Sequence, residues 1–176
     1  MVEINLAYCD ERTLMEAAEH FKREGSMQLL EFLTPKALEK FQNMKWRHVY
    51  VPMKYSYRFV AAPKIPWFSD FVSHIIGGPI NVKLSCLSFA HGDYSVLYDS
   101  LKPGKGYAIM LDINDFPESW GGYTVFMKGS KEVVRVVPKR NSLTIVNQNN
   151  LKSFHKYVNH HAKYPRIFLY GIAVPK

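Results

Sequence analysis

The sequence predicts an α+β domain with a jelly-roll core, and three features of the chain indicate this. Helical spacing of apolar residues is confined to residues 1–78, whereas short extended segments follow one another after Pro79. Turn signals separate these segments about every 8–12 residues, a spacing typical of sandwiches and barrels. The chain has 176 residues and is 47% hydrophobic, which suits one compact domain. We therefore expect a single domain over 1–176, with a helical support over 1–78 and a β core over 79–176.

Local signals place three helices and two extended segments in the first 78 residues. Asp10 stands where a helix cap is needed, and Gly25 stands where that helix would end. Thr34 and Pro35 are the residue types preferred at the N-cap and the first position of a second helix. Apolar residues at helical spacing indicate a third helix before Gly77. In chain order, we expect a helix over 10–22, a strand over 28–33, a helix over 34–44, an extended segment over 46–60 and a helix over 67–76.

The second half of the chain is predicted to form a succession of short strands. Rolled into two sheets, such strands bury one face of each sheet and leave a mouth between the sheets, which is a natural place for a ligand. We therefore expect the functional site at this mouth. The expected strands cover 81–90, 93–98, 106–113, 122–127, 132–137, 142–147, 153–158 and 165–174.

Composition and charge narrow the classes of function. The net charge is +8 and the pI is about 9.4, a balance that attracts anionic partners. The Lys and Arg residues are scattered, however, and no nucleic-acid-binding motif is present, so we do not expect a nucleic-acid partner. Cys9 and Cys86 are too few for a disulfide framework or a thiolate zinc site. Without a signal peptide or an apolar run of about 20 residues, we expect a cytoplasmic protein with no membrane partner.

Several landmarks of the second half occur in an order that resembles a known family. The landmarks are the glycine-led segment 92–100, the strand 107–114, the turn Trp120-Gly121-Gly122, the Pro-led strand 138–146, the pair Phe154-His155 and Arg166 eleven residues later. This set is similar to the prolyl-hydroxylase-like branch of the 2-oxoglutarate/Fe(II)-dependent oxygenases, over roughly residues 27–174. The resemblance implies a double-stranded β-helix, the cupin-like form of the jelly roll, and it implies Fe(II) and 2-oxoglutarate as cofactors of an active member.

The resemblance also implies which positions would form the iron and co-substrate site. In that family a His-x-Asp pair and a distant His hold the iron, and an Arg on the last strand binds 2-oxoglutarate. His155 matches the distant His and Arg166 matches the Arg. The His-x-Asp positions fall on Tyr98 and Ser100, whose neutral oxygens are poor ligands for ferrous iron.

A second departure concerns the co-substrate. Many members of the branch carry a Tyr that helps the Arg to bind the keto acid, and the matching residue here is Asp112. A carboxylate at this position would pair with Arg166 and repel a dianionic acid. We therefore interpret the site as degenerate and the protein as a non-catalytic or altered binding module, with an Asp112–Arg166 ion pair.

In an alternative register the chain would contain a complete iron triad and would be an active enzyme. His91-Gly92-Asp93 is a literal His-x-Asp sequence, and with His155 it would complete the iron triad. Arg166 would then hold 2-oxoglutarate, and the protein would be a dioxygenase that hydroxylates a protein or a small-molecule substrate. The competing interpretation of residues 91–93 is a turn, in which Gly adopts a positive φ and Asp bonds to nearby backbone.

Overall fold

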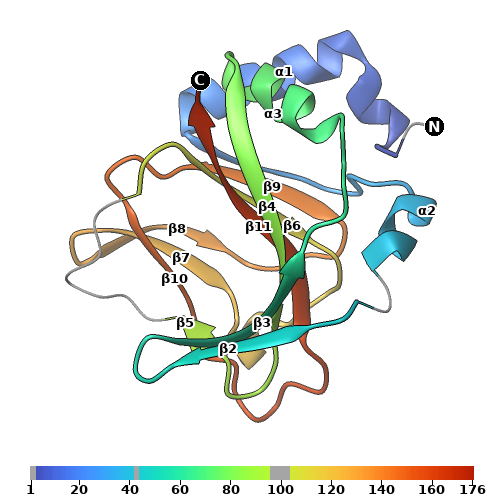
Figure 1. Ribbon diagram of the computed structural model, residues 1–176. Helices are drawn as coiled ribbons and strands as arrows, with labels where there is room; N and C mark the ends of the chain where they lie inside the picture. The colour runs from blue at the N-terminus through green and yellow to red at the C-terminus, as the bar shows by residue number, and fades with distance from the viewer. Residues whose placement is uncertain (1–2, 42–43, 96–103) are drawn as a thin grey trace.

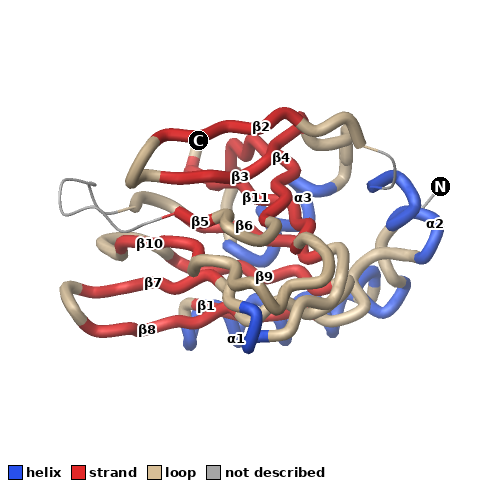
Figure 2. Tube along the Cα trace, turned by 90° about the horizontal axis from the view of Figure 1, so that it is seen from below, coloured by secondary structure: helices blue, strands red, loops and turns tan. Residues whose placement is uncertain are grey.

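Two antiparallel sheets form the body of the protein (Figure 1). The computed structural model describes residues 3–41, 44–95 and 104–176. The large sheet has the strand order β1-β9-β6-β11-β4-β3-β2, with β5 paired to β3, and the small sheet has the order β10-β7-β8. Seen from below, β5 and β10 lie between the β2–β3 hairpin and the strands β7 and β8 (Figure 2). This arrangement confirms the predicted double-stranded β-helix with helices on one sheet.

The sequence signals placed the starts of the helices correctly, but the second helix, expected over 34–44, is shorter: it ends at Leu38 and is followed by a 3₁₀ turn over Glu39–Phe41. Asp10 caps the first helix by accepting a hydrogen bond from the Thr13 amide at 2.9 Å, and Gly25 ends it with a φ of 71°. Thr34 Oγ1 accepts from the Ala37 amide at 3.3 Å at the start of the second helix. The helices are α1 (Glu11–Glu24), α2 (Pro35–Leu38) and α3 (Phe68–Ile76), and single 3₁₀ turns cover Leu6–Cys9, Glu39–Phe41 and Glu118–Trp120.

Most strands match the predicted pattern, with three corrections. The extended segment expected over 46–60 is a hairpin of two paired strands joined by a turn over residues 52–54. Of the strand expected over 93–98, residues 96–98 lie outside the described part of the chain. The strand expected over 28–33 ends earlier because Glu31 adopts a φ of 52°, which is incompatible with an extended strand. The strand expected over 153–158 stops at His155, which pairs with the first residue of the neighbouring strand, Thr124. The strands are β1 (Ser26–Leu29), β2 (Arg47–Val51), β3 (Tyr55–Ala61), β4 (Ile80–Phe89), β5 (Tyr94–Ser95), β6 (Tyr107–Asp112), β7 (Thr124–Lys128), β8 (Lys131–Val136), β9 (Ser142–Asn147), β10 (Lys152–His155) and β11 (Arg166–Pro175).

The first 78 residues supply more than a helical support. Strand β1 extends the large sheet beyond β9, and β3 pairs with β4 and continues into β2 at the other edge. Helices α1 and α3 contact each other and lie together at one end of the molecule (Figure 1). The N-terminal segment therefore contributes both edges of the large sheet as well as the helices that cover it.

The hydrophobic core lies in two layers, one on each face of the large sheet. Ile109 and Leu111 of β6 face the helices, in a cluster that includes Phe32, whereas Ala108 and Met110 face the small sheet. This alternation follows from the two-residue period of a strand. The second layer is the interior of the roll, and the predicted site residues His155, Arg166 and Asp112 lie there. In the described parts of the chain, no helix is long and apolar enough to cross a bilayer.

Candidate binding site in the roll

Arg166 and Asp112 form a fully buried ion pair inside the roll. Arg166 Nε donates to Asp112 Oδ1 at 2.7 Å, and Nη2 donates to Oδ2 at 3.1 Å. Nη1 donates to the Gly122 carbonyl at 2.7 Å and to Thr124 Oγ1 at 3.2 Å. Both charged side chains have no exposed surface. The ion pair expected from the sequence is therefore present, and every nitrogen of the guanidinium already has a partner.

The pair arises from the way in which two strands of the large sheet are aligned. Arg166 begins β11 and Asp112 ends β6, and the register pairs Asp112 with Phe168, two residues after the Arg. Positions 166 and 168 share one face of β11, so the guanidinium reaches the carboxylate diagonally. Complete burial raises the pKa of the Asp112 carboxyl, and the positive charge of Arg166 opposes this effect.

An aromatic ring fills the space beside the guanidinium. The Phe168 ring centroid lies 4.0 Å from Arg166 Cζ and 5.3 Å from the centre of the His155 ring. The ring is completely buried. 2-Oxoglutarate would need both a free guanidinium and room beside it, and these residues supply neither. The described residues therefore do not fit this co-substrate.

His155 ends β10 and lies in an aromatic enclosure. The rings of Phe89, Phe168 and Tyr170 surround it, with centroid distances of 4.9, 5.3 and 5.6 Å. Its Nδ1 is 2.9 Å from Thr124 Oγ1, the residue opposite it in the β10–β7 register. Burial, and secondarily the charge of Arg166, lower the pKa of the imidazole to about 3. His155 is therefore neutral at neutral pH.

His91 and Asp93 belong to a turn beside the roll. His91 is exposed, and Gly92 adopts a φ of 87°. Asp93 is buried, and its two carboxylate oxygens accept from the Ser56 hydroxyl at 2.6 Å and from the Ala90 amide at 2.8 Å. The turn interpretation of residues 91–93 is confirmed by these contacts.

The structure does not assemble the alternative iron triad. Over residues 3–41, 44–95 and 104–176, no three His, Cys, Asp or Glu side chains come together as a metal-binding group. His155 is thus not joined by His91 and Asp93. Tyr98 and Ser100, the positions that the resemblance assigns to the His-x-Asp pair, lie outside the described residues.

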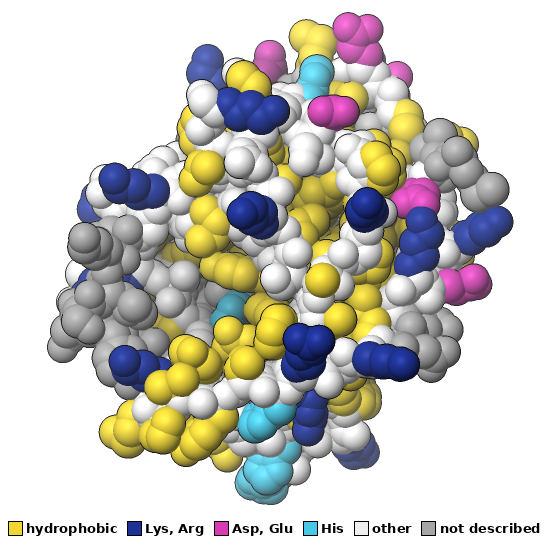
Figure 3. Space-filling model, in the orientation of Figure 1, with side chains coloured by type: hydrophobic (Ala, Val, Ile, Leu, Met, Phe, Trp, Pro, Cys, Tyr) yellow, Lys and Arg dark blue, Asp and Glu magenta, His cyan; other side chains and the backbone are white. Residues whose placement is uncertain are grey.

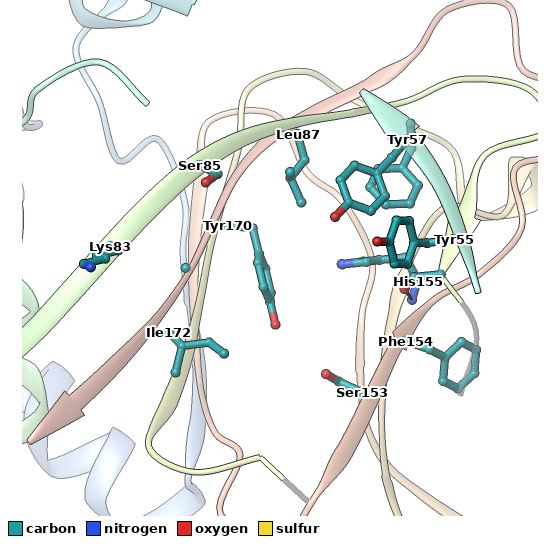
Figure 4. Close-up of a pocket in the computed structure, with 13 residues that line it drawn as sticks. Tyr55, Tyr57, Lys83, Ser85, Leu87, Ser153, Phe154, His155, Tyr170 and Ile172 are labelled. Atoms are coloured by element: carbon teal, nitrogen blue, oxygen red, sulfur yellow. Dashed lines mark hydrogen bonds between the residues drawn. The ribbon is translucent and has the colours of Figure 1, made fainter. Parts of the chain in front are cut away.

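A cavity of about 480 Å³ opens at the mouth of the roll, next to His155. Figure 3 shows a hollow on this face, beside the hydrophobic side chains that cover the β2–β3 hairpin. Figure 4 shows Tyr57 of β3, Tyr170 of β11 and both Ser153 and His155 of β10 converging on the cavity. The walls are formed by Tyr55 and Tyr57 of β3, Lys83, Ser85, Leu87 and Phe89 of β4, Ser95 of β5, Ser153, Phe154 and His155 of β10, and Tyr170, Gly171 and Ile172 of β11.

Three further residues shape this site and were not predicted from the sequence: Phe168, Tyr170 and Thr124. Phe168 and Tyr170 follow Arg166 at steps of two along β11, and this period places all three on one face. That signal was available in the sequence. Thr124, which links His155 to Arg166, depends on the register between β7 and β10, and no local pattern reveals it.

Comparison with known proteins gives a clear likeness in fold. No protein-family model and no curated protein matches the sequence. An oxidoreductase of the 2OG-Fe(II) oxygenase family from Burkholderia pseudomallei is similar, with a TM-score of 0.68 at 10% identity over 93% of this chain and 92% of that one. A prolyl-4-hydroxylase from Pseudomonas putida has a TM-score of 0.64 at 11% identity, over 93% and 99%. A prolyl hydroxylase from Trichoplax adhaerens, solved with a hypoxia-inducible-factor peptide, has a TM-score of 0.65 at 13% identity, over 92% and 90%. The chain has the fold of these oxygenases over nearly its whole length.

Proposed function

We propose that this protein is a binding module that has the 2-oxoglutarate oxygenase fold but does not use 2-oxoglutarate. The observation that carries the proposal is the buried pair of Arg166 with Asp112, whose two hydrogen bonds measure 2.7 and 3.1 Å. In this geometry the protein's own carboxylate occupies the guanidinium that the resemblance assigns to the keto acid. A bidentate Arg–carboxylate pair is stronger than other ion pairs of these groups. To reach Arg166, an incoming acid would have to displace the Asp112 carboxylate, which belongs to the same polypeptide chain.

Electrostatics and packing support the same proposal. A dianionic ligand placed beside Asp112 would meet a like charge in a region of low dielectric. The Phe168 ring, which lies 4.0 Å from the guanidinium, would also have to leave the core. Each change opposes binding on its own. Similarity of fold does not supply the activity, because a fold hosts many different sites.

The donor set also argues against resident Fe(II). Ferrous oxygenase sites use two imidazoles and a carboxylate on one face of the metal. His155 supplies one imidazole, while the carboxylates of Asp93 and Asp112 are bonded to Ser56 and to Arg166. In the register given by the resemblance, Tyr98 and Ser100 would replace the other two ligands. The proposed function therefore involves no iron chemistry.

Calorimetry and a turnover assay test the proposal together. The full chain is titrated with 2-oxoglutarate in the presence of Mn(II), and succinate release is followed with Fe(II) under air. We expect no 2-oxoglutarate binding above background and no succinate. His155→Phe is the matched control, because metal retained by this variant is bound elsewhere. Succinate release that the variant loses would overturn the proposal. It would favour the alternative of a dioxygenase acting through His91, Asp93, His155 and Arg166 on a protein or a small-molecule substrate.

A further inference from the structure

Three buried polar side chains form a chain of hydrogen bonds that leads from the ion pair to the cavity. Arg166 Nη1 donates to Thr124 Oγ1 at 3.2 Å, and the same oxygen lies 2.9 Å from His155 Nδ1. The exposed fractions of Arg166, Thr124 and His155 are 0%, 1% and 8%. Water therefore has little access to these groups, and the three side chains must supply hydrogen-bond partners for one another.

This chain fixes the position of the proton on His155. A guanidinium can only donate, so Thr124 Oγ1 accepts from Arg166. The threonine hydroxyl has one hydrogen, and His155 Nδ1 is its only other partner among the described residues. If Nδ1 carried the proton instead, the hydroxyl hydrogen would be left buried without an acceptor, which is costly. The hydroxyl therefore donates to Nδ1, and the neutral imidazole carries its hydrogen on Nε2.

The Nε2–H group faces the cavity and has no acceptor within the described part of the protein. The only hydrogen bond of the ring there is the one at Nδ1. Figure 4 shows the His155 side chain reaching into the cavity. A ring that binds a metal through Nε2 needs a lone pair on that atom, whereas this tautomer presents a donor. The network thus prepares His155 to hydrogen-bond a ligand rather than to hold a cation.

The other cavity walls define what such a ligand must look like. No Asp, Glu, Asn or Gln is among the described lining residues. The two side chains that can act only as hydrogen-bond donors here, Lys83 and His155 in this tautomer, therefore have no carboxylate or amide beside them in the wall. The rings of Tyr55, Tyr57 and Tyr170 supply flat apolar surface. The volume of about 480 Å³ lies within the range of small-molecule sites, about 300–1,000 Å³.

We infer that the cavity binds a small neutral or anionic molecule that has an apolar ring-sized body and presents a carbonyl or carboxylate oxygen to His155 Nε2–H. The inference rests on the proposed function, since it requires that His155 is not a metal ligand. It adds a chemical class of ligand, the atom that recognises it, and a positioning role for Thr124.

The tautomer can be measured directly on the wild-type protein. With ¹⁵N-labelled histidine, the two ring nitrogens of His155 are assigned by long-range ¹H–¹⁵N correlation. We expect Nδ1 to have the shift of an unprotonated nitrogen and Nε2 the shift of a protonated one. Thr124→Val removes the donor and is expected to change this pattern, and Thr124→Ser is expected to restore it. Protonation of Nδ1 in the wild type would overturn the inference.

Binding is tested with three probes of similar shape: benzamide, benzoate and benzylamine. We expect the first two to bind, with shift changes at His155, and the cationic amine not to bind. His155→Phe keeps a ring within the aromatic enclosure but removes the N–H group, so affinity for benzamide and benzoate should fall about tenfold. Equal binding of all three probes, no binding of the first two, or no effect of the variant would each overturn the inference.

The outcomes separate this inference from the proposed function. If His155 has the opposite tautomer and 2-oxoglutarate still fails to bind, the ligand class is wrong while the proposed function stands. If Mn(II) broadens the His155 resonances at stoichiometric amounts and succinate is released, both are wrong. A donor at Nε2 together with selective benzamide and benzoate binding supports both.

Discussion

The sharpest prediction concerns the charge that is buried with Arg166. Asp112→Asn keeps the shape of the side chain but removes its charge. The carboxylate accepts two hydrogen bonds from the guanidinium, and whichever way an amide is turned, its NH₂ group meets one guanidinium N–H as donor against donor. Removing one partner of a buried ion pair costs about 3–5 kcal/mol, because the other charge stays buried. The amide keeps one acceptor, so we expect the lower end, about 3 kcal/mol.

Chemical and thermal unfolding measure this effect. For a chain of this length, 1 kcal/mol corresponds to about 2–4 °C in Tm, so Asp112→Asn should lower Tm by about 6–12 °C. Glu132→Gln is the matched control. Its carboxylate also binds an Arg with two hydrogen bonds, to Arg135 at 2.8 and 3.1 Å, but both side chains are well exposed, at 37% and 41%. This control should change stability far less than Asp112→Asn does, because an exposed ion pair is screened by water.

Two results would refute the reasoning. The first is a loss in Asp112→Asn no greater than that of the exposed control, which would mean that the guanidinium reaches water. The second comes from the double variant Asp112→Leu/Arg166→Met. If the unpaired charge causes the loss, this apolar pair should be more stable than Asp112→Asn, as buried ion pairs can be replaced by apolar groups at little or no cost. A double variant that is less stable than the single one would contradict that cause.

Two further predictions follow from His155 and from the turn that precedes β7. Because the folded pKa of His155, about 3, lies below the unfolded value of 6.5, its contribution to stability is complete above pH 6.5 and is lost as the pH falls toward 3. Between pH 7 and pH 5 the free energy of unfolding should fall by about 2 kcal/mol more in the wild type than in His155→Phe, and equal slopes would refute this. Gly121 has a φ of 78° and a ψ of −143°, and a Cβ there would overlap the carbonyl oxygen of Tyr157. Gly121→Ala should cost about 3 kcal/mol or more in urea unfolding, against about 1 kcal/mol for Gly129→Ala, which also has a positive φ but open space around it. Equal losses would show that the close contact is irrelevant.

Local chemistry explains why so much of the fold could be predicted from the sequence. The caps at Asp10 and Gly25 act within one turn of the chain, and the strands after Pro79 are marked by residue types and turns. The resemblance then implied that these strands form a double-stranded β-helix, as they do. Glu31 shows the limit of this reasoning, because a non-glycine residue with a φ of 52° ended a strand in a segment whose apolar pattern ran on.

The site could be predicted only in part because its geometry depends on pairing between strands. The Asp112–Arg166 pair was expected from two positions in a family pattern. The Thr124–His155 contact needs the register of β7 against β10, and the filling of the space beside Arg166 needs the orientation of Phe168. These are tertiary facts: a one-residue change of register would turn either side chain to the opposite face.

The contacts of Arg166 are with groups of the protein itself, which distinguishes it from an Arg that binds a ligand. An Arg that binds a ligand must be accessible to solvent when the ligand is absent. Arg166 instead has no exposed surface and has a partner at each of its nitrogens. One of those partners, Thr124, also contacts His155 Nδ1, and the His155 ring lines the cavity. Loss of the Asp112 carboxylate would therefore leave the buried guanidinium unpaired and would also alter the hydrogen bonds that reach the cavity, so ligand preference and folding stability should change together in single variants of Asp112.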